Sequence, residues 1–240
     1  MTRLDSYEPE SYERGSYRLG EPLPGTRRVS ELLADGLSFA REGRVILDDV
    51  SLSAFAGEAL AVTGPSGSGK STLLALLAGL ETPDAGRVLV DGETVGDRVP
   101  EGFGLVLQGY GLVSVLTAAE NVEVVLQGRG LSRDEVRDRA AAHLESVGLD
   151  DVVDHLVEQL SGGQQQRVAV ARALAVEPAV LLADEFTAEL DADSRTRILN
   201  LVLGVARRGG LVVVATHDPD VADSCAAELR LADGRVVPSH

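Results

Sequence analysis

The chain has 240 residues, of which 22 are basic and 38 acidic, giving a net charge of -16. This length suits one large domain or two small ones, and the apolar content is sufficient for a packed core. Such an acidic chain repels nucleic-acid phosphates, so we expect no nucleic-acid partner. No stretch approaches the roughly 20 apolar residues that cross a bilayer, so any membrane role is expected to come from a partner. The single Cys225 forms no internal disulfide and fits no metal-ligand spacing, which favours a small core residue in a reducing cytosol.

The N-terminal segment is of low complexity. It contains three tandem pentapeptides, SYEPE, SYERG and SYRLG, followed by a stretch containing Pro and Gly. We therefore predict a disordered tail over residues 1–28 and a folded domain over residues 29–240. A docking or modification role for Tyr7, Tyr12 and Tyr17 is the alternative, and no function is assigned to them.

The folded domain alternates β-rich runs with helical patterns, which indicates an α/β fold with a mostly parallel sheet covered by helices. A purely helical pattern over about 109–160 predicts a helical insertion. Within it, capping boxes at Thr117–Glu120 and Ser132–Glu135 predict two helix starts. The predicted strands are EALAVT (58–63), RVLV (87–90), FGLVLQ (103–108), AVLLAD (179–184) and LVVVAT (211–216).

A phosphate-binding loop is predicted directly after the first of these strands. Its sequence, GPSGSGKS (64–71), lies between a strand and the helix STLLALLAGL, which is the context such a loop requires. Inward-facing backbone N–H groups and the helix start bind phosphates, and Lys70, the only lysine in the chain, reaches the outer ones. Ser71 would place its hydroxyl on Mg²⁺. The predicted nucleotide-binding residues here are Gly64, Pro65, Ser66, Gly67, Ser68, Gly69, Lys70, Ser71 and Thr72.

Carboxylates and a histidine follow two further strands. The run AVLLADE ends in Asp184 and Glu185, whose side chains face opposite ways in a strand. We expect Asp184 to help hold Mg²⁺ and Glu185 to polarise the water that attacks the γ-phosphate. His217 closes the strand LVVVAT at the same sheet edge, which favours an orienting or sensing role beside that phosphate.

A second phosphate-reading surface is predicted in the run LSGGQQQR (160–167). Ser161 and Gln164 have the spacing of a helix start, with Gly162 and Gly163 between them. One nucleotide needs only one cradle for its γ-phosphate. This second helix start is therefore expected to serve a nucleotide held by another copy of the chain.

Gln108 ends the predicted strand FGLVLQ and precedes a glycine. Its amide is a candidate ligand for Mg²⁺ or for the attacking water. From the residues alone, a structural role is an equally good interpretation.

The order of GPSGSGKST, Gln108, LSGGQQQR, LLADE, AELD and His217 resembles the nucleotide-binding subunit of an ATP-binding cassette (ABC) transporter over about residues 31–240. Within that family, QLSGGQQQRVAVARAL and LTAAENV resemble the lipoprotein-release, macrolide-export and cell-division branch, in which the ATPase is separate from its membrane subunit. The resemblance implies a P-loop NTPase fold, with a mostly parallel core sheet, an antiparallel β subdomain and a helical insertion. It also implies ATP and Mg²⁺ as cofactors and ATP hydrolysis coupled to transport.

The same resemblance implies two partners, a second copy of the chain and an integral membrane permease. In the implied head-to-tail homodimer, residues 161–164 of one subunit cover the ATP that Lys70 of the other binds. Gln108 would act as a metal-contacting and catalytic residue that couples nucleotide state to the permease, and Asp191 would lie at the subunit interface. The implied location is cytoplasmic, on the inner face of the cell membrane through the permease.

The chain departs from the family pattern at two positions. The register of the usual adenine-stacking aromatic residue falls on Arg41, so Arg41 or the nearby Phe39 is expected to contact adenine. The usual proline after the catalytic glutamate is replaced by Phe186, which is expected to affect the turn. Since Glu185 and His217 are both present, we expect hydrolysis to survive.

Two other functions compete with transport. A soluble cassette ATPase of DNA repair or chromosome structure is disfavoured, because the segment between Ser71 and Ser161 has no room for long coiled coils. A translation-type ATPase would usually carry two cassettes, and this chain has one. An ABC-type regulatory or cell-division ATPase with low turnover is the remaining alternative.

Overall fold

The computed structural model describes residues 13–14, 17–20, 23 and 26–238. Its helices are α1 (Lys70–Leu77), α2 (Ala118–Glu123), α3 (Arg133–Ser146), α4 (Gly162–Ala175), α5 (Ala192–Arg207), α6 (Pro219–Asp223) and the 3₁₀ helix η1 (Val157–Gln159). Its strands are β1 (Glu13–Arg14), β2 (Tyr17–Arg18), β3 (Glu31–Arg41), β4 (Arg44–Phe55), β5 (Ala59–Thr63), β6 (Ala85–Val90), β7 (Glu93–Thr94), β8 (Phe103–Val106), β9 (Val180–Asp184), β10 (Leu211–Ala215), β11 (Ala227–Ala232) and β12 (Arg235–Val237).

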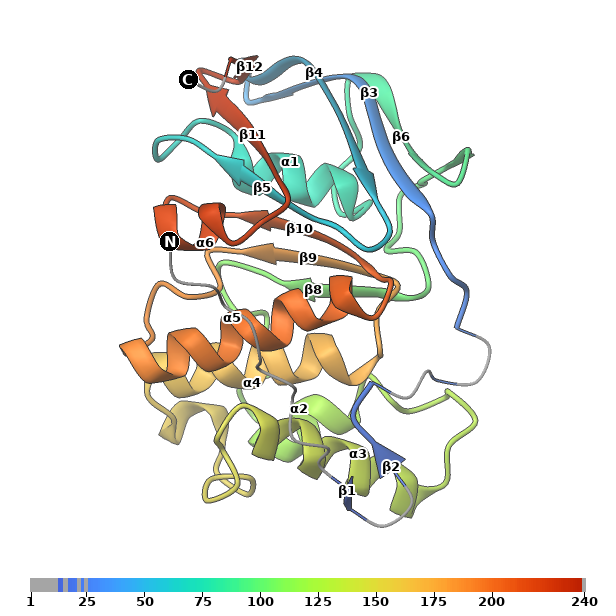
Figure 1. The fold of residues 1–240 in the computed structure, drawn as a ribbon, viewed down its shortest axis with the longest axis vertical. Coiled ribbons are helices and arrows are strands. Elements are labelled where there is room, and N and C mark those ends of the chain that lie inside the picture. The colour runs from blue at the N-terminus through green and yellow to red at the C-terminus, as the bar shows by residue number, and fades with distance from the viewer. Residues whose placement is uncertain (1–12, 15–16, 21–22, 24–25, 239–240) are drawn as a thin grey trace.

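A central six-stranded sheet has the order β12-β11-β5-β10-β9-β8. Its strands pair in parallel from β11 to β8, and only the β11–β12 pair is antiparallel. Figure 1 shows α1 on one face of this sheet, with the strands β3, β4 and β6 beyond it, and α4 and α5 on the opposite face. This layering confirms the predicted α/β class and the mostly parallel core sheet.

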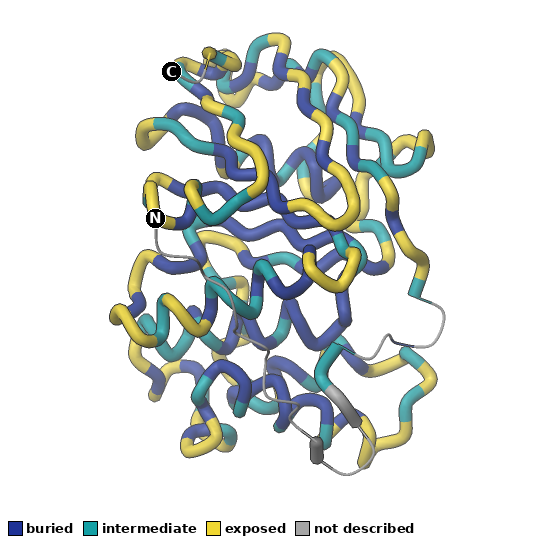
Figure 2. Tube along the Cα trace, in the orientation of Figure 1, coloured by how far each residue is buried: buried dark blue, intermediate teal, exposed yellow. Residues whose placement is uncertain are grey.

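The middle strands of this sheet are buried on both faces. Every residue of β9 and β10 is buried, which matches their unbroken runs of Val, Leu and Ala. Alternate side chains join two apolar clusters: Leu182 and Val213 face α1, whereas Leu181 and Val212 face the α4 and α5 side. Figure 2 shows these strands in dark blue through the middle of the chain. The carboxyl ends of the strands are therefore held firmly at one edge of the sheet.

A second sheet is antiparallel and has the order β4-β3-β6-β7. It corresponds to the antiparallel subdomain that the resemblance implies. The predicted strand 87–90 lies within β6 and so belongs to this sheet and not to the parallel one. Its side chains are mostly half-exposed or exposed, because β6 lies near the edge of an outer layer. A short apolar run does not by itself distinguish these two environments.

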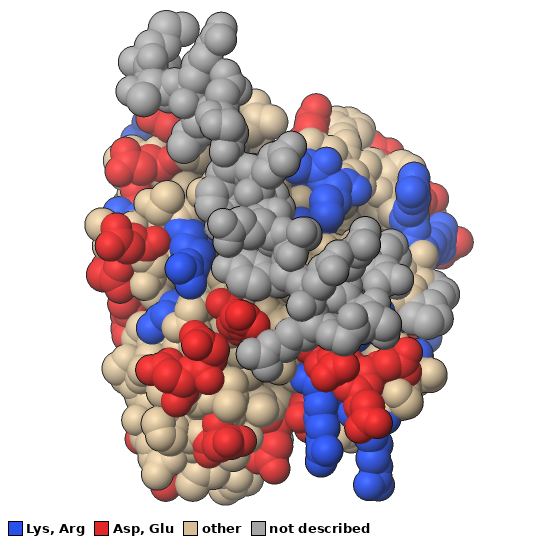
Figure 3. All heavy atoms as spheres, turned by 60° about the horizontal axis from the view of Figure 1, so that its bottom comes forward, with Lys and Arg blue, Asp and Glu red and all other residues tan. Residues whose placement is uncertain are grey.

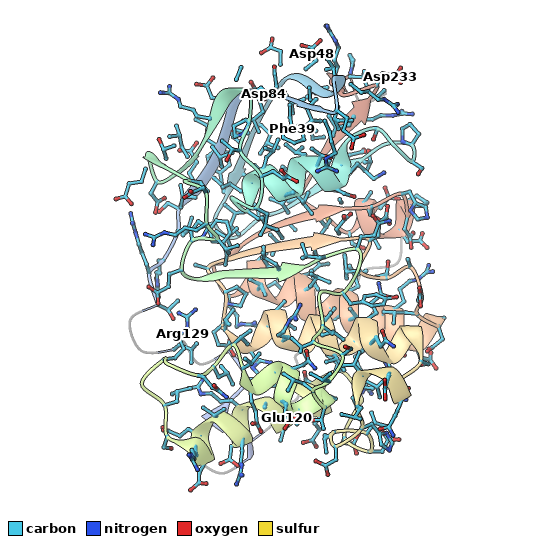
Figure 4. The ribbon with its side chains drawn as sticks, turned by 180° about the vertical axis from the view of Figure 1, so that it is seen from behind. Phe39, Asp48, Asp84, Glu120, Arg129 and Asp233 are labelled. Atoms are coloured by element: carbon cyan, nitrogen blue, oxygen red, sulfur yellow. The ribbon has the colours of Figure 1, made fainter. Side chains whose placement is uncertain are left out.

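The region after β8 contains α2, α3 and η1, in agreement with a helical pattern there. Both predicted capping boxes are present: the Thr117 and Ser132 hydroxyls accept from the Glu120 and Glu135 backbone N–H groups, and the two carboxylates accept in return. Figure 4 places Glu120 in this lower helical layer. The reciprocal bonds fix where each helix begins.

The N-terminal segment differs in part from the predicted disordered tail. Residues 1–12, 15–16, 21–22 and 24–25 lie outside the described residues, so the prediction is not tested there. In the described part, β1 pairs with β2, the Gly20 N–H donates to the Glu177 carboxylate (2.9 Å), and Leu23 is only 3% exposed within the core. These described residues contact the folded domain, because Leu23 finds an apolar site that composition does not reveal. For the rest of the segment the tail stays a prediction.

The remaining general features concern Cys225, the surface and membrane spans. Cys225 packs half-buried against the core, and burial raises the pKa of its thiol to about 11. This agrees with the predicted core role. Figure 3 shows several groups of acidic side chains on one face, with basic side chains between them. Within the described residues, no helix combines the length and the apolar character needed to cross a bilayer.

Candidate nucleotide-binding and catalytic site

A cavity of about 780 Å³ opens at the carboxyl edge of the central sheet. This size is typical of sites for small molecules and cofactors. Residues that follow β5, β9 and β10 meet there, as expected because open α/β sheets bind ligands in a crevice at the carboxyl ends of their strands. The cavity is lined by Arg44, Ile46, Ser66, Gly67, Gly69, Lys70, Ser71, Thr72, Gln108, Tyr110, Gln166, Glu185, Ala188, Glu189 and His217.

The predicted phosphate loop joins β5 to α1 and forms one wall of the cavity. Most of its residues line the cavity, but Gly64, Pro65 and Ser68 do not. Gly69 precedes α1 with a left-handed φ of 104°. Gly64 has a φ of 143°, and a Cβ there would lie 2.1 Å from the carbonyl oxygen of Leu231. These positions need glycine for both conformation and space.

Lys70 is the first residue of α1, and it is 7% exposed. Its Nζ donates to the carbonyl oxygens of Gly64 (2.8 Å) and Pro65 (3.2 Å). The same atom lies 3.9 Å from Oε1 of Glu185. The ammonium is therefore held over the loop with its charge near the Glu185 carboxylate, where it can meet an incoming phosphate.

Asp184 ends β9 beside the start of α1 and is 5% exposed. Burial raises the pKa of this carboxyl group and the neighbouring Glu185 adds to the effect, while a hydrogen bond from Ser71 and the charge of Lys70 oppose it. Its Oδ1 is buried without a hydrogen-bond partner among the described residues. A carboxylate oxygen with a free lone pair next to a serine hydroxyl is a donor set that fits Mg²⁺. Asp184 and Ser71 are the residues that would hold this ion.

Glu185 follows Asp184 and points into the cavity. Its backbone has a left-handed φ of 47°, and its N–H donates to the carbonyl of Ala215 on β10 (2.9 Å). Its Oε2 lies 2.9 Å from Nδ1 of His217, whose side chain is 70% exposed. A non-glycine residue in this conformation is uncommon, and such strain gathers at functional sites. The pair can therefore orient each other beside Lys70.

Phe186 takes the position where the family usually has proline. It is fully buried and belongs to the core cluster between the central sheet and the α4 and α5 layer. An aromatic side chain thus anchors the turn from within the core, while the preceding Glu185 adopts the left-handed region. With Phe186 in place of proline, the turn is therefore held by a buried aromatic side chain.

Gln166 connects α4 to the loop that follows β9. Its Nε2 donates to the Glu185 carbonyl (2.8 Å), and its Oε1 accepts from the Glu189 backbone N–H (3.0 Å). Six residues that line the cavity were not predicted from the sequence: Gln166, Glu189, Arg44, Ile46, Tyr110 and Ala188. The available signal for Gln166 was a polar residue on the inner face of an otherwise apolar helix.

The predicted second phosphate-reading surface begins α4, but it does not line this cavity. Ser161 is the N-cap: its hydroxyl accepts from the Gln164 N–H (3.3 Å), and its own N–H donates to the Gln164 side chain (2.9 Å). Ser161 is exposed, and Gly162, Gly163 and Gln164 are partly exposed. Within one chain, the structure therefore keeps these four residues apart from the phosphate loop.

Asp191 is the N-cap of α5. Its carboxylate accepts from the Ser194 N–H (2.9 Å) and from the Ser194 hydroxyl (2.8 Å). These hydrogen bonds lower the pKa of Asp191. In the single chain, this side chain therefore acts as a helix cap.

Gln108 lines the cavity, but β8 ends at Val106, so Gln108 lies in the following turn and does not end the strand. The strand is shorter than predicted because β8 is an edge strand whose pairing with β9 stops at Ala183. The loop beyond is fixed by Arg172 of α4, which donates to the carbonyls of Tyr110 (2.7 Å) and Gly111 (2.5 Å).

The predicted adenine contacts are not supported. Arg41 does not line the cavity: its guanidinium pairs with Glu81 (2.7 Å) and stands over the Phe39 ring at 5.7 Å. Phe39 is buried in the core that α1 covers, and Figure 4 shows it within the antiparallel layer. Arg44 and Ile46 of β4 line the cavity instead. The spacing from the first glycine could not reveal this, because the turn between β3 and β4 decides which side chains face inward.

The chain matches the model of the family described as "ABC transporter" over residues 47–188. The chain belongs to the ABC transporter family. This match covers the phosphate loop, the α4 start and the carboxylates that end β9. It confirms the family predicted from the order of the motifs.

Curated relatives of this ABC cassette come from several systems. An uncharacterised ABC transporter ATP-binding protein of Thermotoga maritima is 45% identical over 79% of this chain and 85% of its own length. The methionine import ATP-binding protein MetN of Caulobacter vibrioides is 44% identical over 83% of this chain and 63% of its own length. The macrolide export ATP-binding/permease protein MacB of Hyphomonas neptunium is 42% identical over 80% of this chain, which spans 31% of that protein. The macrolide-export relative agrees with the predicted branch.

Solved structures agree with the fold. The dimeric structure of the bacterial ABC transporter cassette MJ0796 has a TM-score of 0.80 and 36% identity, over 86% of this chain and 97% of that one. A post-hydrolysis dimer of the same cassette, bound to ADP and Pi, has the same TM-score and identity. The P-loop NTPase fold of this ABC cassette is therefore confirmed.

Proposed function

We propose that this chain is the ATP-binding and ATP-hydrolysing subunit of an ABC transporter, and that it drives a separate membrane permease by closing as a dimer around ATP. The observation that carries the proposal is the division of the site. Lys70, Glu185 and His217 meet in one cavity, while the exposed start of α4 lies outside it. A second copy placed head to tail supplies the missing surface. The dimeric structures of a similar cassette, one with ADP and Pi, support this arrangement.

The residues of the cavity divide the work of hydrolysis. The loop N–H groups and Lys70 bind the phosphates, and Ser161 and the adjacent glycines of the second copy close over the γ-phosphate. Ser71, Asp184 and Gln108 would hold Mg²⁺, which would supply positive charge against the phosphates. Glu185 accepts a proton from the attacking water as general base. His217, placed against Glu185, orients that carboxylate and senses the γ-phosphate.

The permease partner follows from the same proposal. Residues 29–240 form the ATPase domain, and its helical insertion, about 109–160, offers the permease a surface beside Gln108. The complex would lie on the cytoplasmic, inner face of the cell membrane. The names of the import and export relatives support a transport role and leave the direction open.

Replacement of Glu185 by Gln tests the function. Loss of the general base should slow ATP turnover by roughly 10²-fold or more. The same variant should accumulate an ATP-bound dimer, measured by size-exclusion chromatography with light scattering. The wild type should also hydrolyse faster when a candidate integral membrane subunit is added in detergent.

Equally slow hydrolysis by the wild type and by Glu185→Gln would contradict the catalytic assignment. It would favour the alternative, an ABC-type regulatory or cell-division ATPase with low turnover. Fast wild-type turnover that no membrane subunit alters would retain the ATPase and count against the transport role.

A further inference from the structure

Glu189 lies in the loop between β9 and α5, close to the start of α4. A Cβ added to Gly162 would lie 1.8 Å from Oε2 of Glu189, and one added to Gly163 would lie 2.7 Å from the Glu189 carbonyl oxygen. The carboxylate therefore rests directly against the first residue of α4. Side chains at these two positions would displace Glu189, so the glycines allow this close approach as well as any contact with phosphate.

Two neighbours hold Glu189 in this place. Its backbone N–H donates to Oε1 of Gln166 (3.0 Å), which fixes the main chain. Tyr110 lines the same cavity as Glu189, and the Glu189 carboxylate helps to raise the pKa of the Tyr110 phenol, so the two side chains lie close together. Tyr110 is itself held by Arg172 of α4 through its carbonyl oxygen. The Glu189 carboxylate thus lies between the loop that follows Gln108 and the start of α4.

The position of Glu189 matters because its negative charge opposes the binding of a negatively charged phosphate at the start of α4. The start of α4 presents free N–H groups and a partial positive charge, which attract phosphate. Glu189 brings a carboxylate to the same few ångströms. The Glu189 carboxylate repels the γ-phosphate of an incoming nucleotide. It also competes with that phosphate for the partial positive charge at the start of α4.

We propose that Glu189 is an anionic latch, which occupies the approach to the start of α4 and must swing away before ATP on a second copy can dock. This inference rests on the proposed shared site. Tyr110 keeps the latch closed, and because Tyr110 lies two residues after Gln108, a movement of that loop releases it. Glu189 thereby opposes dimer closure until ATP is bound and the loop that contains Tyr110 has moved.

The latch is tested by the ATP concentration that gives half-maximal dimer, measured in the Glu185→Gln background so that ATP persists. Adding Glu189→Gln keeps the shape and removes the charge, and should lower that concentration by about 5-fold or more, within the usual range of coupling between sites. Tyr110→Phe should shift it in the same direction by less, because the charge stays. Raising the salt concentration should reduce the difference in this ATP concentration between the protein with Glu189 and the Glu189→Gln variant, because salt screens the charge.

Glu158→Gln is the matched control. Glu158 is an exposed acid on η1, close in sequence to Ser161, and no contact of its side chain with Gly162 is found in the described chain. The Glu158→Gln variant changes the net charge by as much as Glu189→Gln does, and it should leave the ATP concentration for half-maximal dimer unchanged. Thermal unfolding of every variant reports whether a difference comes from stability instead.

The failures of the two proposals are distinguishable. If Glu185→Gln itself forms no dimer at saturating ATP, the shared site is wrong and the latch falls with it. If that parent dimerises but Glu189→Gln needs as much ATP or more, only the latch is overturned. An equal shift with Glu158→Gln would reduce the effect to general charge and would also overturn the latch.

Discussion

At the scale of single residues, the raised pKa of the Tyr110 phenol reports on its burial and on the neighbouring Glu189 carboxylate. Burial raises the pKa of this phenol to about 12, and its hydrogen bond to Glu189 and the charge of that carboxylate add to the effect. An ordinary tyrosine ionises near pH 10. Because the folded-state pKa is the higher one, the stabilising contribution of this phenol is present below pH 10 and is lost as pH rises towards 12.

We expect the difference in tyrosinate absorbance between wild type and Tyr110→Phe to have a midpoint near pH 12. The subtraction isolates Tyr110 from Tyr7, Tyr12 and Tyr17. Glu189→Gln should move the midpoint down, because it removes the negative charge that opposes ionisation. A midpoint near 10 that Glu189→Gln does not alter would show that the hydroxyl is free of the carboxylate.

At the scale of elements, α4 joins the parts of the site that are distant in sequence. Its N-cap presents Ser161, its first turns hold the loop after β9 through Gln166, and its last turn holds the loop after β8 through Arg172. A movement of this one helix would therefore be transmitted to Glu185 and to the turn of Gln108. The helix is a mechanical link between the two phosphate-reading surfaces.

Gln166→Leu should break this link. It leaves the Glu189 N–H and the Glu185 carbonyl without their partner, which should destabilise the fold by about 1–3 kcal/mol and lower ATP turnover further than that loss explains. Gln165→Leu is the matched variant, because Gln165 donates to Val157 and Leu160 on the other side of the helix. Denaturant unfolding and ATPase rates check both. Equal turnover of the two variants at equal stability would argue against the link.

At the scale of the whole molecule, the two halves of each active site should come from different subunits. A Lys70→Ala subunit and a Ser161→Arg subunit are each inactive as homodimers under this proposal. In a mixed dimer, one site carries both substitutions and the other carries neither. An equal mixture should therefore recover about a quarter of the wild-type turnover, since half of the dimers are mixed and each has one intact site.

The recovery is checked by mixing the two variants in monomeric form before ATP is added. Mixing Lys70→Ala with Glu185→Gln is the control. Both residues belong to the same half, so every site of the mixed dimer carries one of the two substitutions and no recovery is expected. Absence of recovery in the first mixture would place Lys70 and Ser161 in the same subunit's site.

Much of the site could be predicted because its chemistry is local in sequence. The loop 64–71, the capping box of Ser161 with Gln164, and the pair Asp184 and Glu185 are each defined by neighbouring residues, and the parallel sheet then brings β5, β9 and β10 to one edge. The two capping boxes of the helical insertion were predictable for the same reason. Local hydrogen bonds and strand ends need no knowledge of distant packing.

By itself, therefore, the sequence determined the family, the α/β class and the phosphate-binding half of the site. Only the tertiary structure decided that Arg44 and not Arg41 faces the cavity, that the strand at 87–90 joins the antiparallel sheet, and that Glu189 rests on Gly162. Each depends on which distant segments meet, through a turn, a sheet order or a close approach of two loops. Such contacts are set by packing of the whole chain, which no short run of residues encodes.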